Sequence, residues 1–113
     1  MKHEEDHIQE VCVNWFRLRY REPKYLIYAI PNGGNRNLRE AARLKKTGVR
    51  NGVADLQVLA KNKTFYIEMK TETGKQSPEQ KEFEKIVVDL GFNYYLCRSF
   101  DDFSKVCRLE LGE

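Results

Sequence analysis

The sequence has no long hydrophobic run and contains few cysteines. None of its apolar segments approaches the roughly 20 residues that a membrane-spanning helix needs, and the acidic N-terminal segment MKHEEDHIQE lacks the apolar region of an export signal. The three cysteines are an odd number and form no CxxC pair, which argues against a zinc ribbon and predicts free, buried thiols. We therefore expect a cytoplasmic protein that has no membrane partner.

Histidine is also scarce, because His3 and His7 are the two in the chain. They fall in HEEDH, which satisfies the HExxH pattern of zinc peptidases. The segment lies at a chain end, no third histidine exists to complete a ligand set, and its acidic residues are not typical of a buried helix. The pattern therefore does not predict a zinc peptidase.

The chain has enough apolar residues to form one domain over residues 1–113, since 41% of its 113 residues are hydrophobic and 33% are charged. Hydrophobic periodicity and turn residues predict the order αβαββαβα, a mixed α/β fold with a central sheet flanked by helices. Ser77, Pro78 and Gln80 are typical of a capped helix start, and Gly91 of a helix end. We expect helices over about 4–20, 37–46, 77–90 and 99–111, and strands over 24–30, 52–60, 63–70 and 93–98.

Positive charge is concentrated in one segment, although the formal net charge is only +3. Residues 35–52 contain six basic side chains against one acidic one, whereas residues 1–10 contain four acidic side chains against one lysine. A localised basic run indicates an anionic partner, with nucleic acid the leading candidate. A helix face exposed to solvent explains the run equally well when the segment is considered alone.

The segment GVADLQVLAKNKTFYIEMK predicts a hairpin that brings charged residues together. A two-residue turn at Lys61 and Asn62 sets a register in which one face is wholly apolar. The same register places Asp55 opposite Glu68, with Cβ atoms roughly 5 Å apart, and Lys70 about 7 Å further along that face. The apolar pairs expected are Val58 with Phe65, Leu56 with Ile67 and Ala54 with Met69.

Two carboxylates so close together repel each other unless a positive charge lies between them. A hard cation such as Mg²⁺ suits them, since it binds a few carboxylate oxygens, keeps several waters and leaves room for a phosphate oxygen. Such an ion polarises a phosphodiester and activates a water, and Lys70 would orient that water or offset the phosphate charge. The alternative is a surface ladder of Asp55, Glu68 and Lys70 satisfied by solvent, which two opposed acids disfavour.

These residues resemble a known nuclease pattern. Asp55 followed by Glu68-Met69-Lys70 resembles the D…ExK signature of the PD-(D/E)XK nucleases, and four neighbouring segments make the resemblance more specific. In chain order, PNGGNR, GVRNGVAD, IEMK and GKQSPEQ resemble the VRR-NUC nucleases over about residues 5–98, as in the stand-alone members of phages and bacteria. For a phage protein, the expected location is the host cytoplasm. Ala54 stands where the family often has proline, and we expect little effect because the register turns Ala54 toward the apolar face.

The resemblance implies a restriction-endonuclease-like fold and a Mg²⁺-dependent DNA endonuclease, with Mn²⁺ as a substitute ion. It implies that Asp55, Glu68 and the main-chain carbonyl of Met69 bind the metal, and that Lys70 is the catalytic lysine. Gln80 lies near the site in similar enzymes, although its role as a helix cap is equally consistent here. An N-terminal helix glutamate also belongs to such sites, binding the ion directly or through a water.

Helical periodicity places both Glu4 and Glu5 on the inner side of the first helix. The family's E-x-x-I spacing to Ile8 selects Glu5. We therefore expect Glu5 to be the N-terminal residue of the site.

The DNA partner is expected to be branched, such as a flap or a Holliday junction, and recognised by shape because no base-reading module is visible. A homodimer would supply two active sites for symmetric cleavage. Trp15, Phe16, Phe100 and Phe103 fit either a dimer interface or the monomer core. A DNA-binding module without catalysis is the alternative function. The residues expected to contact DNA are Asn32, Gly33, Gly34, Arg36, Arg39, Arg43, Lys46 and Arg50, although the two glycines fit a turn equally well.

Overall fold

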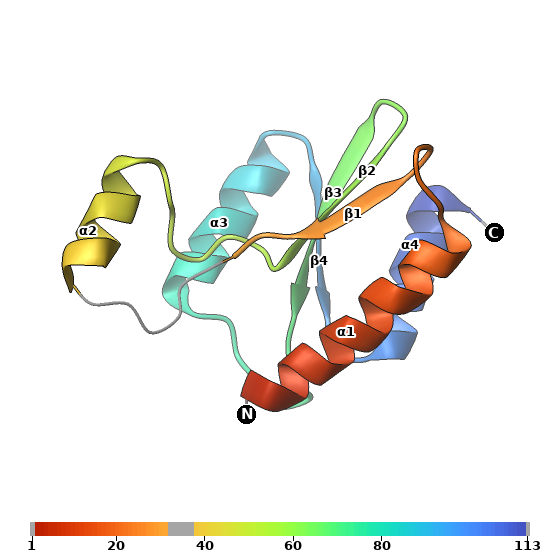
Figure 1. Cartoon of the computed structure of the whole chain (residues 1–113), viewed down its shortest axis with the longest axis horizontal. Helices are drawn as coiled ribbons and strands as arrows, with labels where there is room; N and C mark the ends of the chain where they lie inside the picture. Colours follow the sequence, from red (N-terminus) through yellow and green to blue (C-terminus); the bar gives the residue numbers. More distant parts are fainter. Residues whose placement is uncertain (1, 32–37, 113) are drawn as a thin grey trace.

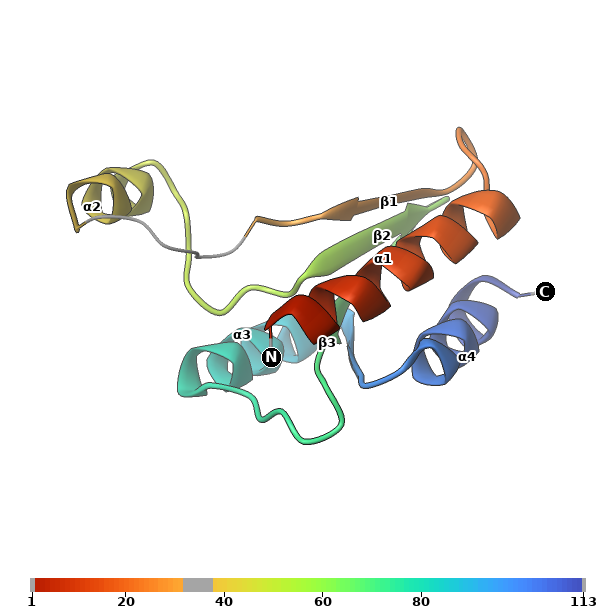
Figure 2. The same ribbon diagram turned by 60° about the horizontal axis from the view of Figure 1, so that its bottom comes forward.

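Four strands form one mixed sheet, and helices lie on both of its faces (Figures 1 and 2). The computed structural model describes residues 2–31 and 38–112. Within these ranges no helix combines the length and the apolar character needed to span a bilayer. The predicted order αβαββαβα is confirmed. The elements are α1 (Lys2–Arg19), β1 (Leu26–Ala29), α2 (Leu38–Lys46), β2 (Leu56–Ala60), β3 (Lys63–Met69), α3 (Pro78–Asp89), β4 (Asn93–Cys97) and α4 (Phe100–Leu111).

Strand directions bring three chain segments to one edge of the sheet. The strands lie in the order β1-β2-β3-β4, with β2 antiparallel to β3, and β3 parallel to β4. The start of β2 therefore lies beside the ends of β3 and β4. The predicted hairpin register is confirmed from Leu56 with Ile67 to Ala60 with Lys63. Asn62 occupies the turn with a φ of 58°, a conformation that asparagine tolerates better than most residues.

The ladder between β2 and β3 ends sooner than the register predicts, and the expected pairing of Ala54 with Met69 is not among its pairs. The main-chain N–H of Asp55 donates to the Ile67 carbonyl at 3.1 Å, so the chain leaves the regular register just before Leu56. Ala54 consequently packs with Val87 on the α3 side of the sheet. The expectation that Ala54 shares the apolar face of Leu56 was wrong for this reason.

The main core lies between the sheet and the pair α1 and α4. Phe16 of α1 and Phe103 of α4 are fully buried against strand residues such as Leu56, so these two aromatics belong to the monomer core. Trp15 is partly buried and packs edge-on against Phe100, their ring centroids 5.4 Å apart. The three cysteines are free and buried, as predicted. A smaller apolar cluster joins α3 to the opposite face.

The ends of α3 follow the local sequence. The Ser77 side chain accepts the main-chain N–H of Gln80, and the Gln80 side chain accepts that of Ser77, which confirms the capping box. Gly91 ends the helix with a φ of 97°. By contrast α2 projects from one side of the molecule, away from the sheet, in both ribbon views (Figures 1 and 2).

Gly52, in the loop after α2, packs against the first turn of α3. It has a φ of +84°, and a Cβ added there would lie 2.5 Å from both the carbonyl carbon and the carbonyl oxygen of Glu79. We expect Gly52→Ala to lower the free energy of unfolding by about 2 kcal/mol, because the added methyl group meets rigid backbone and the positive φ is strained. Urea unfolding monitored by circular dichroism measures this loss.

Gly48→Ala is the matched control, because Gly48 also has a positive φ, +112°, but has nothing within 4 Å of the added Cβ. A loss in Gly52→Ala no larger than that in Gly48→Ala would show that the contact with Glu79 does not constrain the loop.

Candidate active site

The predicted acidic residues and lysine meet at the sheet edge where β2 begins and β3 ends. Asp55 immediately precedes β2, Glu68 is the second-last residue of β3, and Lys70 directly follows it. The Asp55 Oδ2 accepts the main-chain N–H of Met69 at 2.6 Å, so the carboxylate continues the ladder that the backbone has left. The N-terminal end of α1, which carries Glu5, lies at the same end of the molecule (Figure 2).

Glu68 is fully buried, and its two carboxylate oxygens have different surroundings. Oε1 accepts hydrogen bonds from the Tyr94 hydroxyl at 2.6 Å and from Gln76 Nε2 at 2.9 Å. Oε2 has no hydrogen-bond partner among the described residues, and it lies 3.5 Å from Lys70 Nζ. The Lys70 side chain is itself 12% exposed. A buried carboxylate with one long ion pair and one unbonded oxygen lacks full compensation for its lost hydration.

The same surroundings shift the pKa of the Asp55 carboxyl. Burial raises the pKa of its carboxyl to about 6, and the hydrogen bond from the Met69 amide opposes this rise. The negative charges of Glu68 and Glu5 raise the pKa further, while the positive charge of Lys70 lowers it. Two further carboxylates and one lysine therefore act on the Asp55 carboxyl, so its surroundings carry surplus negative charge.

This arrangement fits a hard divalent cation. Carboxylate oxygens are the ligands that Mg²⁺ prefers, and the unbonded Oε2 of Glu68 is a buried acceptor available for it. Across residues 2–31 and 38–112, no three His, Cys, Asp or Glu side chains are grouped so as to hold a metal. An ion at Asp55 and Glu68 would thus retain several waters, as Mg²⁺ does. Met69 supplies its amide to Asp55, and its carbonyl remains a predicted ligand.

Two glutamines of the GKQSPEQ segment have different positions. Gln80, the predicted site residue, uses its side-chain oxygen to accept the Ser77 N–H at 2.8 Å, so its role as a helix cap is confirmed. Gln76 contacts the site directly, since its Nε2 donates to Glu68 and also to Glu84 Oε1 at 2.8 Å. The capping-box pattern predicted the position of Gln80, whereas nothing in the segment predicted that Gln76 would contact Glu68.

Tyr94 is a second site residue that the sequence did not reveal. It lies on β4 beside Tyr66 of β3, and because side chains alternate along a strand it shares a face with Glu68. Burial is the main cause that raises the pKa of the Tyr94 hydroxyl, and the hydrogen bond to Glu68 adds to it, so this hydroxyl stays protonated and donates. Its position depends on a register across β3 and β4 that no local pattern specifies.

Arg98 fixes the loop that leads from β3 to Gln76. Its Nη1 donates to the main-chain carbonyls of Thr71 at 2.8 Å, Glu72 at 3.1 Å and Gly74 at 2.7 Å. The loop is therefore held from the end of β4, the strand that carries Tyr94.

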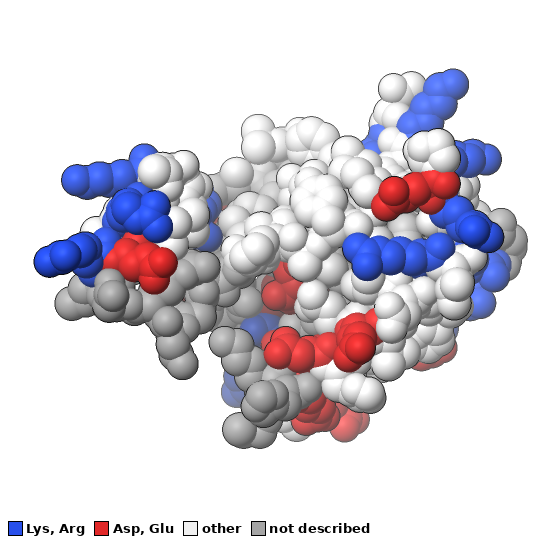
Figure 3. Space-filling model, in the orientation of Figure 1, with Lys and Arg blue, Asp and Glu red and all other residues white. Residues whose placement is uncertain are grey.

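The basic residues lie apart from this carboxylate site. Arg39, Arg43 and Lys46 are exposed on α2, and Arg50 is exposed shortly after it. Lys and Arg side chains gather over the projecting α2, while Asp and Glu side chains gather toward the N-terminal end of α1 (Figure 3). Arg43 and Arg50 form long surface ion pairs of 3.9 Å with Glu40 and 3.7 Å with Glu82. The predicted DNA contacts Asn32, Gly33, Gly34 and Arg36 lie outside the described residues.

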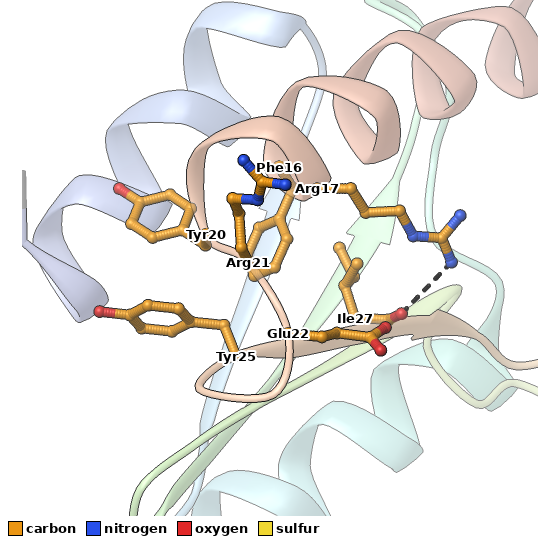
Figure 4. Close-up of a pocket in the computed structure, with 7 residues that line it drawn as sticks. All are labelled: Phe16, Arg17, Tyr20, Arg21, Glu22, Tyr25 and Ile27. Atoms are coloured by element: carbon orange, nitrogen blue, oxygen red, sulfur yellow. Dashed lines mark hydrogen bonds between the residues drawn. The ribbon is translucent and has the colours of Figure 1, made fainter.

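A pocket of about 260 Å³ lies at the C-terminal end of α1, away from these residues. Figure 4 shows the Arg17 guanidinium beside the Ile27 carbonyl, to which it donates at 3.5 Å. The pocket contains none of the predicted site residues. It is lined by Phe16, Arg17, Tyr20, Arg21, Glu22, Tyr25 and Ile27.

Comparisons with known proteins bear on the family and the fold. The family model of the VRR-NUC domain matches residues 3–101. A solved structure described as a "VRR_NUC domain protein" has a TM-score of 0.77 to this chain, covering 95% of this chain and 87% of that chain at 23% sequence identity. That structure is similar in fold. A comparison with curated proteins found no match.

Proposed function

Because the chain belongs to the VRR-NUC domain family, a family of nuclease-type domains, we propose that it is a Mg²⁺-dependent, structure-specific DNA endonuclease. It hydrolyses phosphodiester bonds in branched DNA, such as flaps or Holliday junctions, and Mn²⁺ can replace Mg²⁺. The observation that carries this proposal is the buried Glu68, whose unbonded Oε2 lies beside Lys70 and in the electrostatic field of Asp55.

In this proposal Asp55 and Glu68 hold the ion, with the Met69 carbonyl as a further ligand and Glu5 acting through a water. The bound ion supplies a Lewis acid for the phosphate and lowers the pKa of a coordinated water. Lys70 acts at the same place, because its ammonium lies near Glu68 with little exposure and can donate to a phosphate oxygen or orient the attacking water. The surplus negative charge at the sheet edge keeps DNA away until a cation is bound.

DNA binding is proposed to use the exposed cations of α2 and Arg50, together with Asn32, Gly33, Gly34 and Arg36. Contacts of these residues with phosphates carry no sequence information, so the shape of the DNA determines which DNA the protein binds best. A homodimer of this domain over residues 1–113 would cut two strands symmetrically. Its three free thiols suit the reducing cytoplasm.

Cleavage of labelled linear, flapped and four-way-junction DNA with Mg²⁺ or Mn²⁺ tests the proposal. We expect strand cleavage that EDTA abolishes and that is faster on branched substrates. Binding to all of these DNAs with no cleavage in either metal would instead establish the non-catalytic DNA-binding module. Light scattering of the free protein would show a mass of twice 13.4 kDa for the dimer.

Replacing two α2 cations tests the predicted DNA surface. We expect the double variant Arg39→Gln/Arg43→Gln to bind every DNA shape about tenfold more weakly. The slope of the logarithm of the association constant against the logarithm of the salt concentration should become less steep by about two, because fewer counterions are released on binding. Fluorescence anisotropy over a range of NaCl concentrations measures both quantities.

The control for this variant replaces Lys85 and Lys105 with glutamine, since both are exposed cations on other helices. An equal loss in the control, or a loss confined to one DNA sequence, would contradict a role for α2 in recognition of DNA shape.

A further inference from the structure

The buried Glu68 is held by two donors that converge on one of its oxygens. The Tyr94 hydroxyl comes from β4 and Gln76 Nε2 from the loop before α3, at 2.6 and 2.9 Å from Oε1. A carboxylate oxygen has two lone-pair positions, and both are used at Oε1. Tyr94 is 8% exposed, so its hydroxyl has little access to water as an alternative hydrogen-bond partner. The carboxylate plane of Glu68 is therefore fixed in the absence of any ligand.

Gln76 is fixed in turn by a second carboxylate. Its Nε2 has two protons, and it donates to Glu68 Oε1 and to Glu84 Oε1, the latter at 2.8 Å. The reverse orientation of the amide would turn its oxygen toward two carboxylates, which repel it. Glu84 thus sets the direction in which Gln76 donates. We call Tyr94, Gln76 and Glu84 the Glu68 clamp.

The clamp leaves Oε2 as the one oxygen of Glu68 without a hydrogen bond among the described residues. We propose that Tyr94 and Gln76 are positioning residues that present Oε2 alone to the divalent cation and thereby favour Mg²⁺ and Mn²⁺ over Ca²⁺. This inference rests on the proposed function, because it concerns the same ion site. Neither residue contacts the reacting atoms in this role.

The preference follows from the different ligand demands of these ions. Mg²⁺ requires a small, near-octahedral shell, whereas Ca²⁺ takes six to eight oxygens and often binds both oxygens of one carboxylate. A Glu68 released from Tyr94 is free to rotate and to offer both oxygens. Groups that orient metal ligands typically contribute 10–100-fold to affinity. Releasing Glu68 should therefore weaken binding of Mn²⁺ more than binding of Ca²⁺.

Isothermal titration calorimetry of the full chain with MnCl₂ and, separately, with CaCl₂ at pH 7.5 tests the clamp. We expect Tyr94→Phe and Gln76→Leu each to bind Mn²⁺ about 10–100-fold more weakly than the wild type, with a smaller change for Ca²⁺. Circular dichroism verifies that each variant is folded. If Tyr94→Phe does not fold, Gln76→Leu still decides the question, because Gln76 is half-buried in a loop.

Matched controls come from the same sheet. The Tyr95 hydroxyl donates to Glu110 on α4, so Tyr95→Phe removes a similar bond to a carboxylate outside the site. Gln57 bridges Tyr28 and Thr64 through its side chain, so Gln57→Leu is the counterpart of Gln76→Leu. Both controls should bind Mn²⁺ as the wild type does.

Two outcomes overturn the inference, and they differ in what else they overturn. If the wild type binds Mn²⁺ and the Tyr94 and Gln76 variants bind it equally well, or lose Mn²⁺ and Ca²⁺ affinity in equal proportion, the clamp has no positioning role while the proposed function stands. If the wild type binds no Mn²⁺ with or without DNA, the proposed ion site fails and the clamp fails with it.

Discussion

Asp55→Asn is expected to be more stable than the wild type in the absence of metal and to lose cleavage by about 10³-fold. The loss of activity follows because an ion ligand is removed, and a metal contributes several kcal/mol to the transition state. The stability gain follows because the charge of Asp55 is unfavourable where it lies, whereas an asparagine oxygen still accepts the Met69 N–H. If replacing a catalytic residue raises the free energy of unfolding, that residue serves activity and destabilises the folded protein.

The pH dependence of this stability gain has a definite sign. The Asp55 carboxyl has a pKa of about 6 in the fold against 3.8 as the ordinary value, so between these values the folded chain binds a proton that the unfolded chain does not. Stability of the wild type therefore falls as pH rises from about 4 to about 6, and the full cost is present above pH 6. That cost is at most about 3 kcal/mol at pH 7.5.

Urea unfolding of both proteins with EDTA at pH 7.5 and at pH 4 measures the effect. The advantage of Asp55→Asn should be largest at pH 7.5 and should nearly vanish at pH 4. Asp89→Asn is the control, since Asp89 is exposed in a surface pair with Lys85. An Asp55 variant that is less stable than the wild type at pH 7.5 would show that burial and the neighbouring carboxylates do not disfavour the Asp55 charge.

Lys70→Met is expected to lose cleavage to a similar degree, about 10³-fold, but with the opposite effect on stability. Methionine has a similar length and keeps the packing of the stem, yet it leaves the buried Glu68 without its ion-pair partner at 3.5 Å. Breaking one side of a buried pair is expected to cost about 3 kcal/mol in the metal-free protein. Added Mn²⁺ should recover part of this loss, because the ion neutralises the same carboxylate.

Comparing Lys70→Met with Lys63→Met separates catalysis from folding. Lys63 also pairs with a largely buried carboxylate, that of Glu110 at 3.2 Å, but on another part of the sheet. Both variants should lose stability, and only Lys70→Met should lose cleavage of a four-way junction while it retains binding to that DNA. Equal cleavage by the two variants would remove Lys70 from the proposed mechanism.

The hairpin was predictable from the sequence because its information is local. Leu56, Val58, Phe65 and Ile67 alternate with polar residues around a two-residue turn, and a shift of one position would expose them all. The same reasoning placed Asp55 close to Glu68. It did not predict that the chain leaves the register before Leu56, where the Asp55 side chain accepts the Met69 N–H and Ala54 packs on the other face.

The second layer of the site depends on contacts between distant segments. Tyr94 reaches Glu68 because β4 pairs with β3 in parallel after the whole of α3, and neither residue type nor spacing fixes that register. Arg98 holds the loop after β3 by donating to three of its main-chain carbonyls, and nothing in the loop sequence predicts this contact. A motif identifies the acidic residues and lysine, whereas the groups that orient them become visible when the sheet is assembled.

The most direct test of the shared ion site is the anomalous difference density of a crystal soaked in MnCl₂. The account predicts a peak within bonding distance of both the Asp55 carboxylate and Glu68 Oε2, with Oε1 still bonded to Tyr94 and Gln76. A soaked crystal with no Mn²⁺ peak at these two carboxylates, or with Lys70 occupying the space between them, would contradict it.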